Sequence, residues 1–185
     1  VYKRQEVFAR AIANHGTVVL GVAVNNSDET LPMTKAKFGL VTQGDNPDQF
    51  LPAYTGLKPN ISLLEDNAAG IGTMSIGNND SVVRSLPTFD RVGEAVIPSL
   101  GLELARVAIG ASTFQIKASN ASSEEAFGAQ TGINNIKLGP LTMPTTPDGQ
   151  SWIYFAPTAE LVTVSAWDVL SGSIDPDFFS GKVVL

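Results

Sequence analysis

The chain has 185 residues, of which 43% are hydrophobic, 16% charged and 8% aromatic. This composition supplies enough apolar material for a core and too little charge for an intrinsically disordered chain. The formal net charge is -6, and the densest basic cluster is Lys3-Arg4. Nucleic acids and anionic membrane surfaces both bind concentrated positive charge, so neither class of partner fits this sequence.

The sequence contains no cysteine, which excludes disulfides, zinc–thiolate sites and thiol nucleophiles. Its longest apolar run, Thr17 to Val24, is far shorter than the ~20 residues that a membrane-spanning helix requires. The chain starts at Val1 without a signal peptide, and it ends inside a predicted strand at 182–185. We therefore expect a fragment that is trimmed at both ends.

The first predicted unit is a helix followed by a buried strand. Apolar residues at helical spacing predict a helix that ends at Gly16, with Glu6 and Arg10 on its outer face. Its apolar stripe consists of Val7, Phe8, Ala11 and Ile12. The β-branched run 17–24 predicts a strand that is apolar on both faces, which favours the middle of a parallel sheet. Residues 25–58 predict an irregular excursion with one short strand.

The middle of the chain predicts short strands around one clear helix. A short helix is expected over 59–67, ending at Gly70, and a strand over 71–76. Turns at 77–80 and 90–93 flank a strand over 82–89, a pattern typical of a hairpin or meander. The clear helix follows Pro98 and ends at Gly110. Its predicted inward stripe is Leu100, Leu104, Val107 and Ala108, and its predicted outward residues are Glu103 and Arg106.

The last third is less regular in its pattern. Residues 111–132 are polar and of low complexity, so we expect an exposed loop there. Strands are predicted over 133–138 and 151–155, with a turn at 147–149 between them. Ser165 opens a short helix that Gly172 ends, and Asp175-Pro176 opens a single turn. Trp167 and Leu170 are expected to lie in the core.

Few residues could support catalysis. His15 is the only histidine, and its place at a helix end favours a role in capping the helix dipole. No Gly-x-Ser-x-Gly nucleophile elbow is present. The segment 70–75 nearly matches the dinucleotide fingerprint, yet it leads into a predicted strand rather than the helix that the motif requires, which favours a helix cap and strand start.

Acidic residues are the remaining candidates. The carboxylate pairs that a hydrolase could use are Glu65-Asp66, Glu124-Glu125 and Asp175-x-Asp177. We interpret them as solvated or helix-capping groups, since surface carboxylates are common. The clusters Asp45-x-x-Asp48 and Asn78-Asn79-Asp80 could hold calcium but lack EF-hand spacing. We therefore predict no catalytic residues, no metal site and no cofactor, and we leave the ligand-binding residues unassigned.

Five short motifs occur in an order that resembles the type-two CHASE domain, a cyclase/histidine kinase-associated sensory extracellular module. They are Ala69-Gly70-Ile71-Gly72; the strand from Asn79 to Pro87, with Ser81 in place of the usual glycine; the helix from Ile97 to Arg106; Val164 to Gly172; and Phe179 to Leu185. The resemblance covers more than half of the chain. Residues 25–58 match no pattern of the family.

The resemblance implies a sensor rather than an enzyme. Family members usually have membrane helices on both sides and a cytoplasmic nucleotide cyclase or kinase as output. We therefore expect a single mixed α/β domain over 1–185, with a partly parallel sheet flanked by helices. It would be an extracytoplasmic, membrane-anchored input domain, dimeric in the full-length receptor, that binds an unknown small molecule or envelope protein.

Two alternatives to a sensor remain open at this point. One is a small α/β hydrolase that uses carboxylates, and the other is a structural envelope domain. Arg84 could pair with Asp80 across the predicted turn or bind an anionic ligand. The family pattern supplies no ligand-binding residues to carry over.

Overall fold

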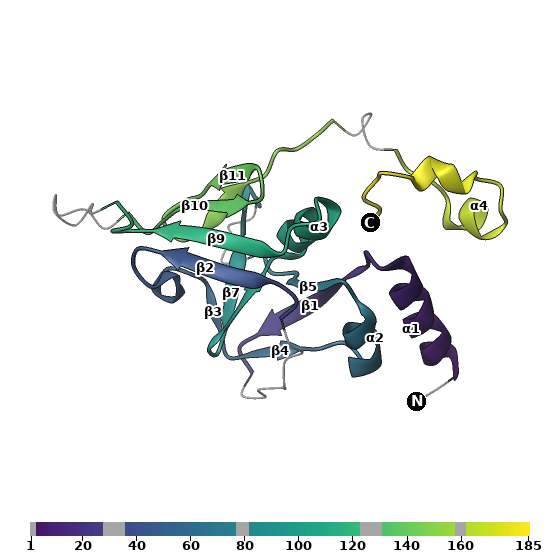
Figure 1. Ribbon diagram of the computed structural model, residues 1–185, viewed down its shortest axis with the longest axis horizontal. Helices are drawn as coiled ribbons and strands as arrows, with labels where there is room; N and C mark the ends of the chain where they lie inside the picture. The colour runs from purple at the N-terminus through teal and green to yellow at the C-terminus, as the bar shows by residue number, and fades with distance from the viewer. Residues whose placement is uncertain (1–2, 28–35, 77–81, 123–130, 158–161) are drawn as a thin grey trace. The chain divides into compact units, whose positions relative to one another are not determined.

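The computed structural model describes residues 3–27, 36–76, 82–122, 131–157 and 162–185 (Figure 1). The chain divides into two compact units, residues 1–152 and 153–185, each of which is described by itself. The larger unit combines helices with sheets that contain both parallel and antiparallel strand pairs. The predicted mixed α/β class with partly parallel sheets is thus confirmed.

The first sheet is built around the predicted central strand. Its strand order is β4-β1-β5, with β1 parallel to β5 and antiparallel to β4. Helices α1 and α2 pack against each other beside this sheet. The elements are α1 (Lys3–His15), β1 (Val19–Asn25), β4 (Gly56–Lys58), α2 (Ser62–Asn67) and β5 (Gly70–Thr73). The run at 17–24 is therefore the middle strand, as its two apolar faces predict.

Both helices of this region end with specific backbone contacts. Gly16 has a φ of +76° and donates its amide to the Ile12 carbonyl at 3.1 Å, so it ends α1 as predicted. Helix α2 has its last residue at Asn67, as predicted, but it begins at Ser62, and Gly70 belongs to β5 and does not end the helix. The Lys37 ammonium donates to three carbonyls there, those of Glu65, Asp66 and Ala68. A cation at a helix carboxyl terminus also complements the helix dipole.

The buried side of α1 differs from the predicted stripe. Ala9 and Ile12 are buried, whereas Val7 is 60% and Phe8 54% exposed. Ala11 is exposed as well. Helix α1 packs against α2, and Ala9 and Ile12 are its buried residues. The predicted helix is confirmed, but its inward face is rotated.

The second sheet carries most of the core. Its order is β11-β10-β9-β2, and β2 runs parallel to β9, with Leu40 opposite Phe114. The strands are β2 (Gly39–Gln43), β9 (Thr113–Ala118), β10 (Ile133–Leu138) and β11 (Leu141–Pro144). The Phe114 ring lies edge-on to Phe38 and to Phe89, with centroid separations of 5.2 Å and 5.3 Å. These contacts form the centre of the main core.

Two regions are more regular than the sequence indicates. The expected loop at 111–132 is wrong for 113–118, because β9 alternates buried Phe114, Ile116 and Ala118 with polar residues. Residues 36–58 are expected to be irregular, yet they contain four elements. These are β2, the 3-10 turn η1 (Pro47–Gln49), β3 (Ala53–Tyr54) and β4. Long-range strand pairing imposes this order, which local composition does not reveal.

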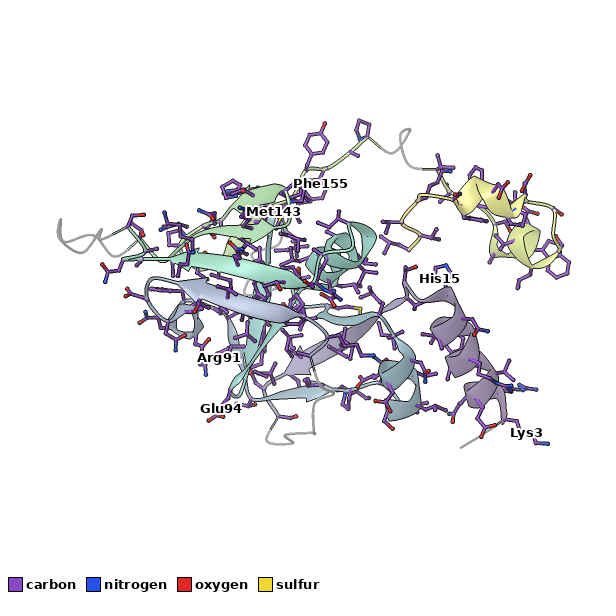
Figure 2. All side chains as sticks on the ribbon, viewed as in Figure 1. Lys3, His15, Arg91, Glu94, Met143 and Phe155 are labelled. Carbon is purple, nitrogen blue, oxygen red and sulfur yellow. The ribbon has the colours of Figure 1, made fainter. Side chains whose placement is uncertain are left out.

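Two small sheets complete the larger unit. Their orders are β3-β7-β8 and β12-β6. The strands are β6 (Ser85–Pro87), β7 (Phe89–Val92), β8 (Ala95–Pro98) and β12 (Gln150–Trp152). The turn predicted at 90–93 is wrong, since β7 and β8 form a hairpin that turns at Gly93 and Glu94 (Figure 2). The turn predicted at 77–80 lies outside the described residues.

Helix α3 (Leu100–Ala108) follows β8 and packs on β5. It ends at Gly110 as predicted, with the amides of Gly110 and Ala111 bound to the carbonyls of Val107 and Arg106. Its predicted orientation is wrong, because Glu103 and Arg106 are buried together with Leu102. Helix α3 packs on β5 at Gly70 and Gly72, which have no side chains. This leaves space for the side chains of Glu103 and Arg106 to be buried.

Gly72 allows the start of α3 to approach β5 closely. A Cβ atom at this position would lie 2.5 Å from the Leu100 Cα and 2.9 Å from the Ser99 carbonyl carbon. Backbone cannot yield as a flexible side chain does, so Gly72→Ala should destabilise the fold by about 1–3 kcal/mol or more, measured by urea unfolding. Gly101→Ala is the control. Its Cβ would meet nothing within 4 Å, so it should be neutral or stabilising; an equal loss in both variants would contradict the packing argument.

The second unit contains α4 (Ala166–Leu170) and the 3-10 turn η4 (Pro176–Phe179). Both begin as predicted, because the Ser165 hydroxyl accepts the Trp167 amide and the Asp175 carboxylate accepts the Asp177 amide. Trp167 is 74% and Leu170 83% exposed. Their predicted core positions are therefore wrong, since so short a unit cannot enclose a core by itself. The strand predicted at 182–185 is also absent from the structure, which has no regular element there.

Candidate functional site

The carboxylate pairs that could support hydrolysis are placed differently from a catalytic pair. On α2, Glu65 is buried and its carboxylate accepts the Asn60 amide at 2.8 Å, whereas Asp66 is exposed. Of the two roles expected for Glu65, the solvated one is therefore wrong, and its carboxylate instead binds a backbone amide just before α2. Asp175 caps η4 in the second unit. Glu124 and Glu125 lie outside the described residues.

The other candidate positions have structural roles. His15 is the last residue of α1, and its Nδ1 atom lies 2.9 Å from the Thr17 hydroxyl (Figure 2). The Asp48 amide is bound by the Asn46 side chain at the start of η1. Within the described ranges, no group of three or more His, Cys, Asp and Glu residues could hold a metal ion. The cluster 78–80 lies outside those ranges.

The near-match to a dinucleotide fingerprint at 70–75 forms β5 and its exit. The segment contains the predicted strand start, and its hydroxyl groups bind a buried carboxylate. The Thr73 hydroxyl donates to Oδ2 of Asp90 at 2.5 Å, and the Ser75 hydroxyl donates to the same atom at 2.7 Å. Thr73 also forms an isolated parallel bridge with Ser99, the residue before α3. We call Thr73, Ser75 and Asp90 the carboxyl cluster.

The electrostatics of the carboxyl cluster are unusual. Asp90 is fully buried, and its Oδ1 atom has no hydrogen-bond partner among the described residues. Burial raises the pKa of the Asp90 carboxyl above its ordinary value of 3.8, while the hydrogen bonds from Thr73 and Ser75 lower it. A buried charge is expensive without compensation, so burial disfavours the ionised form of Asp90 relative to an exposed carboxyl group.

A second buried polar cluster lies at the other end of β5. The Arg106 guanidinium donates from Nε and Nη2 to the two oxygens of Glu103, at 2.8 Å and 2.7 Å. It also donates to the carbonyls of Ala69 and Ala111, at 3.0 Å and 2.9 Å. A Cβ atom at Gly70 would collide with the Glu103 carboxylate. This ion pair therefore joins α3, the start of β5 and the entry to β9.

Together the two clusters place polar interactions along a single strand. Sequence reasoning assigned Asp90 to a turn and placed Glu103 and Arg106 on the surface, so it missed both clusters. One feature of the sequence could have indicated the two polar clusters. Gly70 and Gly72 lie two residues apart in a strand, and glycines there often mark the close approach of another element.

The comparison with known families identifies the family to which this chain belongs. The model of the CHASE2 domain matches residues 2–185. The chain belongs to the CHASE2 family. CHASE2 domains are sensory extracellular domains, which agrees with the resemblance seen in the five motifs. Comparisons with curated proteins and with solved structures found no match.

Two further observations concern membrane-spanning helices and the suggested ligand contact at Arg84. In the ranges that the structure describes, none of the helices has the length and apolar character needed to cross a bilayer. Arg84, the motif residue considered as a ligand contact, is exposed just before β6. Its suggested partner Asp80 lies outside the described residues, so the pairing of Arg84 with Asp80 stays a prediction.

Proposed function

We propose that this CHASE2 domain is the extracytoplasmic signal-input module of a membrane-anchored receptor that controls a cytoplasmic nucleotide cyclase or kinase. The observation that carries the proposal is the match to a sensory extracellular family over residues 2–185. The order of the five motifs supports it. The domain itself would be non-catalytic and would respond to a small molecule, an envelope protein or an envelope condition.

The signal would act by shifting a conformational equilibrium of a receptor dimer. A ligand shifts such an equilibrium only by the difference between its affinities for the two states. Two polar contacts join α3 and β5 at their ends, because Arg106 donates to the Ala69 carbonyl just before β5 and Thr73 forms a bridge with Ser99 just before α3. Polar contacts of this kind are directional and favour discrete arrangements over gradual deformation.

The experiment uses the complete reading frame that encodes this chain. Alkaline phosphatase fused after residue 152 should be active in cells, because that enzyme requires an oxidising compartment for its disulfides. Membranes from cells that express the complete protein should then show cyclase or kinase activity that changes when residues 1–185 are deleted. An inactive fusion, or an output that is indifferent to the deletion, would contradict the sensor proposal.

A further inference from the structure

Asp90 lies where two sheets of the larger unit meet. It is in β7 of the β3-β7-β8 sheet, and both of its hydrogen-bond donors belong to the β5 segment of the β4-β1-β5 sheet. The Thr73–Ser99 bridge crosses the same boundary, and β5 contacts β8. The state of one carboxyl group therefore bears directly on how the two sheets are joined.

No described charged group compensates an ionised Asp90. The β5 segment 70–76 and strands β1 and β8 contain no titratable side chain. Arg91 is next in β7, but alternation points its side chain to the opposite face, and it donates to the Gly93 carbonyl. Glu103 and Arg106 of α3 bind each other. The remaining titratable groups on adjoining segments are Tyr54 of β3 and Glu94 of the hairpin turn.

The hydrogen bonds to Asp90 all fall on Oδ2, and Oδ1 is left without a partner among the described residues. Thr73 and Ser75 both donate to Oδ2, which can act as the carbonyl oxygen of a protonated carboxyl group. Oδ1 would then carry the proton. If the proton leaves, Oδ1 becomes a buried anionic oxygen without a donor, and such an atom is stabilised only when water or another donor reaches it.

We propose that Asp90 is a proton-binding switch at this sheet junction. When it is protonated, it holds the β5 segment against the β7–β8 hairpin; when it is ionised, it favours an opened junction in which water reaches Oδ1. The ligand of this site is the proton, and the signal is acidification outside the cell. The physiological role of the switch rests on the sensor function proposed above. The titration of Asp90 and the opening of the junction do not, because both can be measured on the 185-residue chain by itself.

The sign of the pH dependence follows from burial. The folded state binds the Asp90 proton more tightly than the unfolded chain, whose carboxyl has the ordinary pKa of 3.8. The stabilisation is therefore full below this value, and it is lost as the pH rises through the higher pKa of the folded state. Acidification through the raised pKa of Asp90 should stabilise the closed junction, and a pH above that pKa should favour the opened one.

The direct test is a carboxyl-carbon NMR titration of the 185-residue chain, combined with amide hydrogen exchange. The Asp90 signal should titrate with a midpoint above 3.8. Exchange at Thr73, Ser75 and Ser99 should slow several-fold on acidification with the same midpoint, after correction for the intrinsic pH dependence of exchange. Asp90→Asn mimics the protonated group and should keep these amides slow throughout. Asp66→Asn, which changes an exposed carboxyl, should behave as the wild type.

Ser75→Ala separates a switch from a merely structural residue. The Ser75 hydroxyl lowers the pKa of Asp90, so its removal should move the Asp90 midpoint and the exchange midpoint upward together. Ser112→Ala, which removes an exposed hydroxyl, should move neither.

Two results would overturn the switch. One is an Asp90 midpoint at or below 3.8, and the other is a raised midpoint without any linked change in exchange at the junction. Neither result affects the fusion and deletion experiment on the complete receptor. The sensor function and the proton switch can therefore fail independently.

Discussion

Arg106→Met will be among the most destabilising substitutions in this domain, with an expected loss of about 3–5 kcal/mol in the free energy of unfolding. The substitution leaves the fully buried Glu103 carboxylate without the guanidinium that binds both of its oxygens. It also removes the donors to the Ala69 and Ala111 carbonyls. Urea unfolding followed by circular dichroism measures the loss.

The pair itself is tested by the double variant Glu103→Leu with Arg106→Met. Replacing both members of a buried ion pair with apolar residues is often close to neutral, so the double variant should recover much of the stability that Arg106→Met loses. Arg84→Met, at an exposed arginine, should change stability by less than about 0.5 kcal/mol. A double variant that is no more stable than Arg106→Met would show that the carbonyl contacts, and not the buried carboxylate, determine the loss.

The elements that the sequence predicted well are those with strong local signals. The α1 helix ends at Gly16, and α3 ends at Gly110, because a glycine with positive φ satisfies the last carbonyls of a helix. Ser165 and Asp175 begin their elements by accepting backbone amides two residues ahead. These are short-range interactions, so the residues that make them are visible in the sequence.

The features that were missed depend on partners far away in the chain. Strand β9 alternates correctly for a strand, but its Thr, Gln and Lys residues lie beside a polar low-complexity segment that hides the pattern. Its burial becomes evident only when β2 and β10 pair with it on either side. The same holds for Asp90, whose hydroxyl donors are 15 and 17 residues away.

The inverted face of α3 has the same origin. Helical periodicity alone places Leu100, Leu104 and Val107 inward, because hydrophobicity is the only guide it offers. The structure buries Glu103 and Arg106 instead, since Gly70 leaves room above β5 and each charge neutralises the other.

Phe114→Ala tests whether β9, the strand that lies in the predicted loop at 111–132, is the centre of the core. Phe114 is fully buried in β9, with its ring between those of Phe38 and Phe89. Truncating a buried phenylalanine removes its apolar contacts and leaves a cavity, so we expect a loss of about 3–5 kcal/mol in the free energy of unfolding. The whole free energy of unfolding of a typical domain is only ~5–15 kcal/mol, so a loss of this size is a large part of it.

The matched control is Phe155→Ala, because Phe155 is 69% exposed and is labelled in Figure 2. It should change the unfolding midpoint in urea by little, equivalent to less than about 0.5 kcal/mol. Because Phe89 precedes Asp90 in β7, the cavity left by Phe114→Ala also lies beside the strand that carries the carboxyl cluster. If both substitutions proved equally mild, β9 would behave as a surface strand, and Phe114 would not be the centre of the main core.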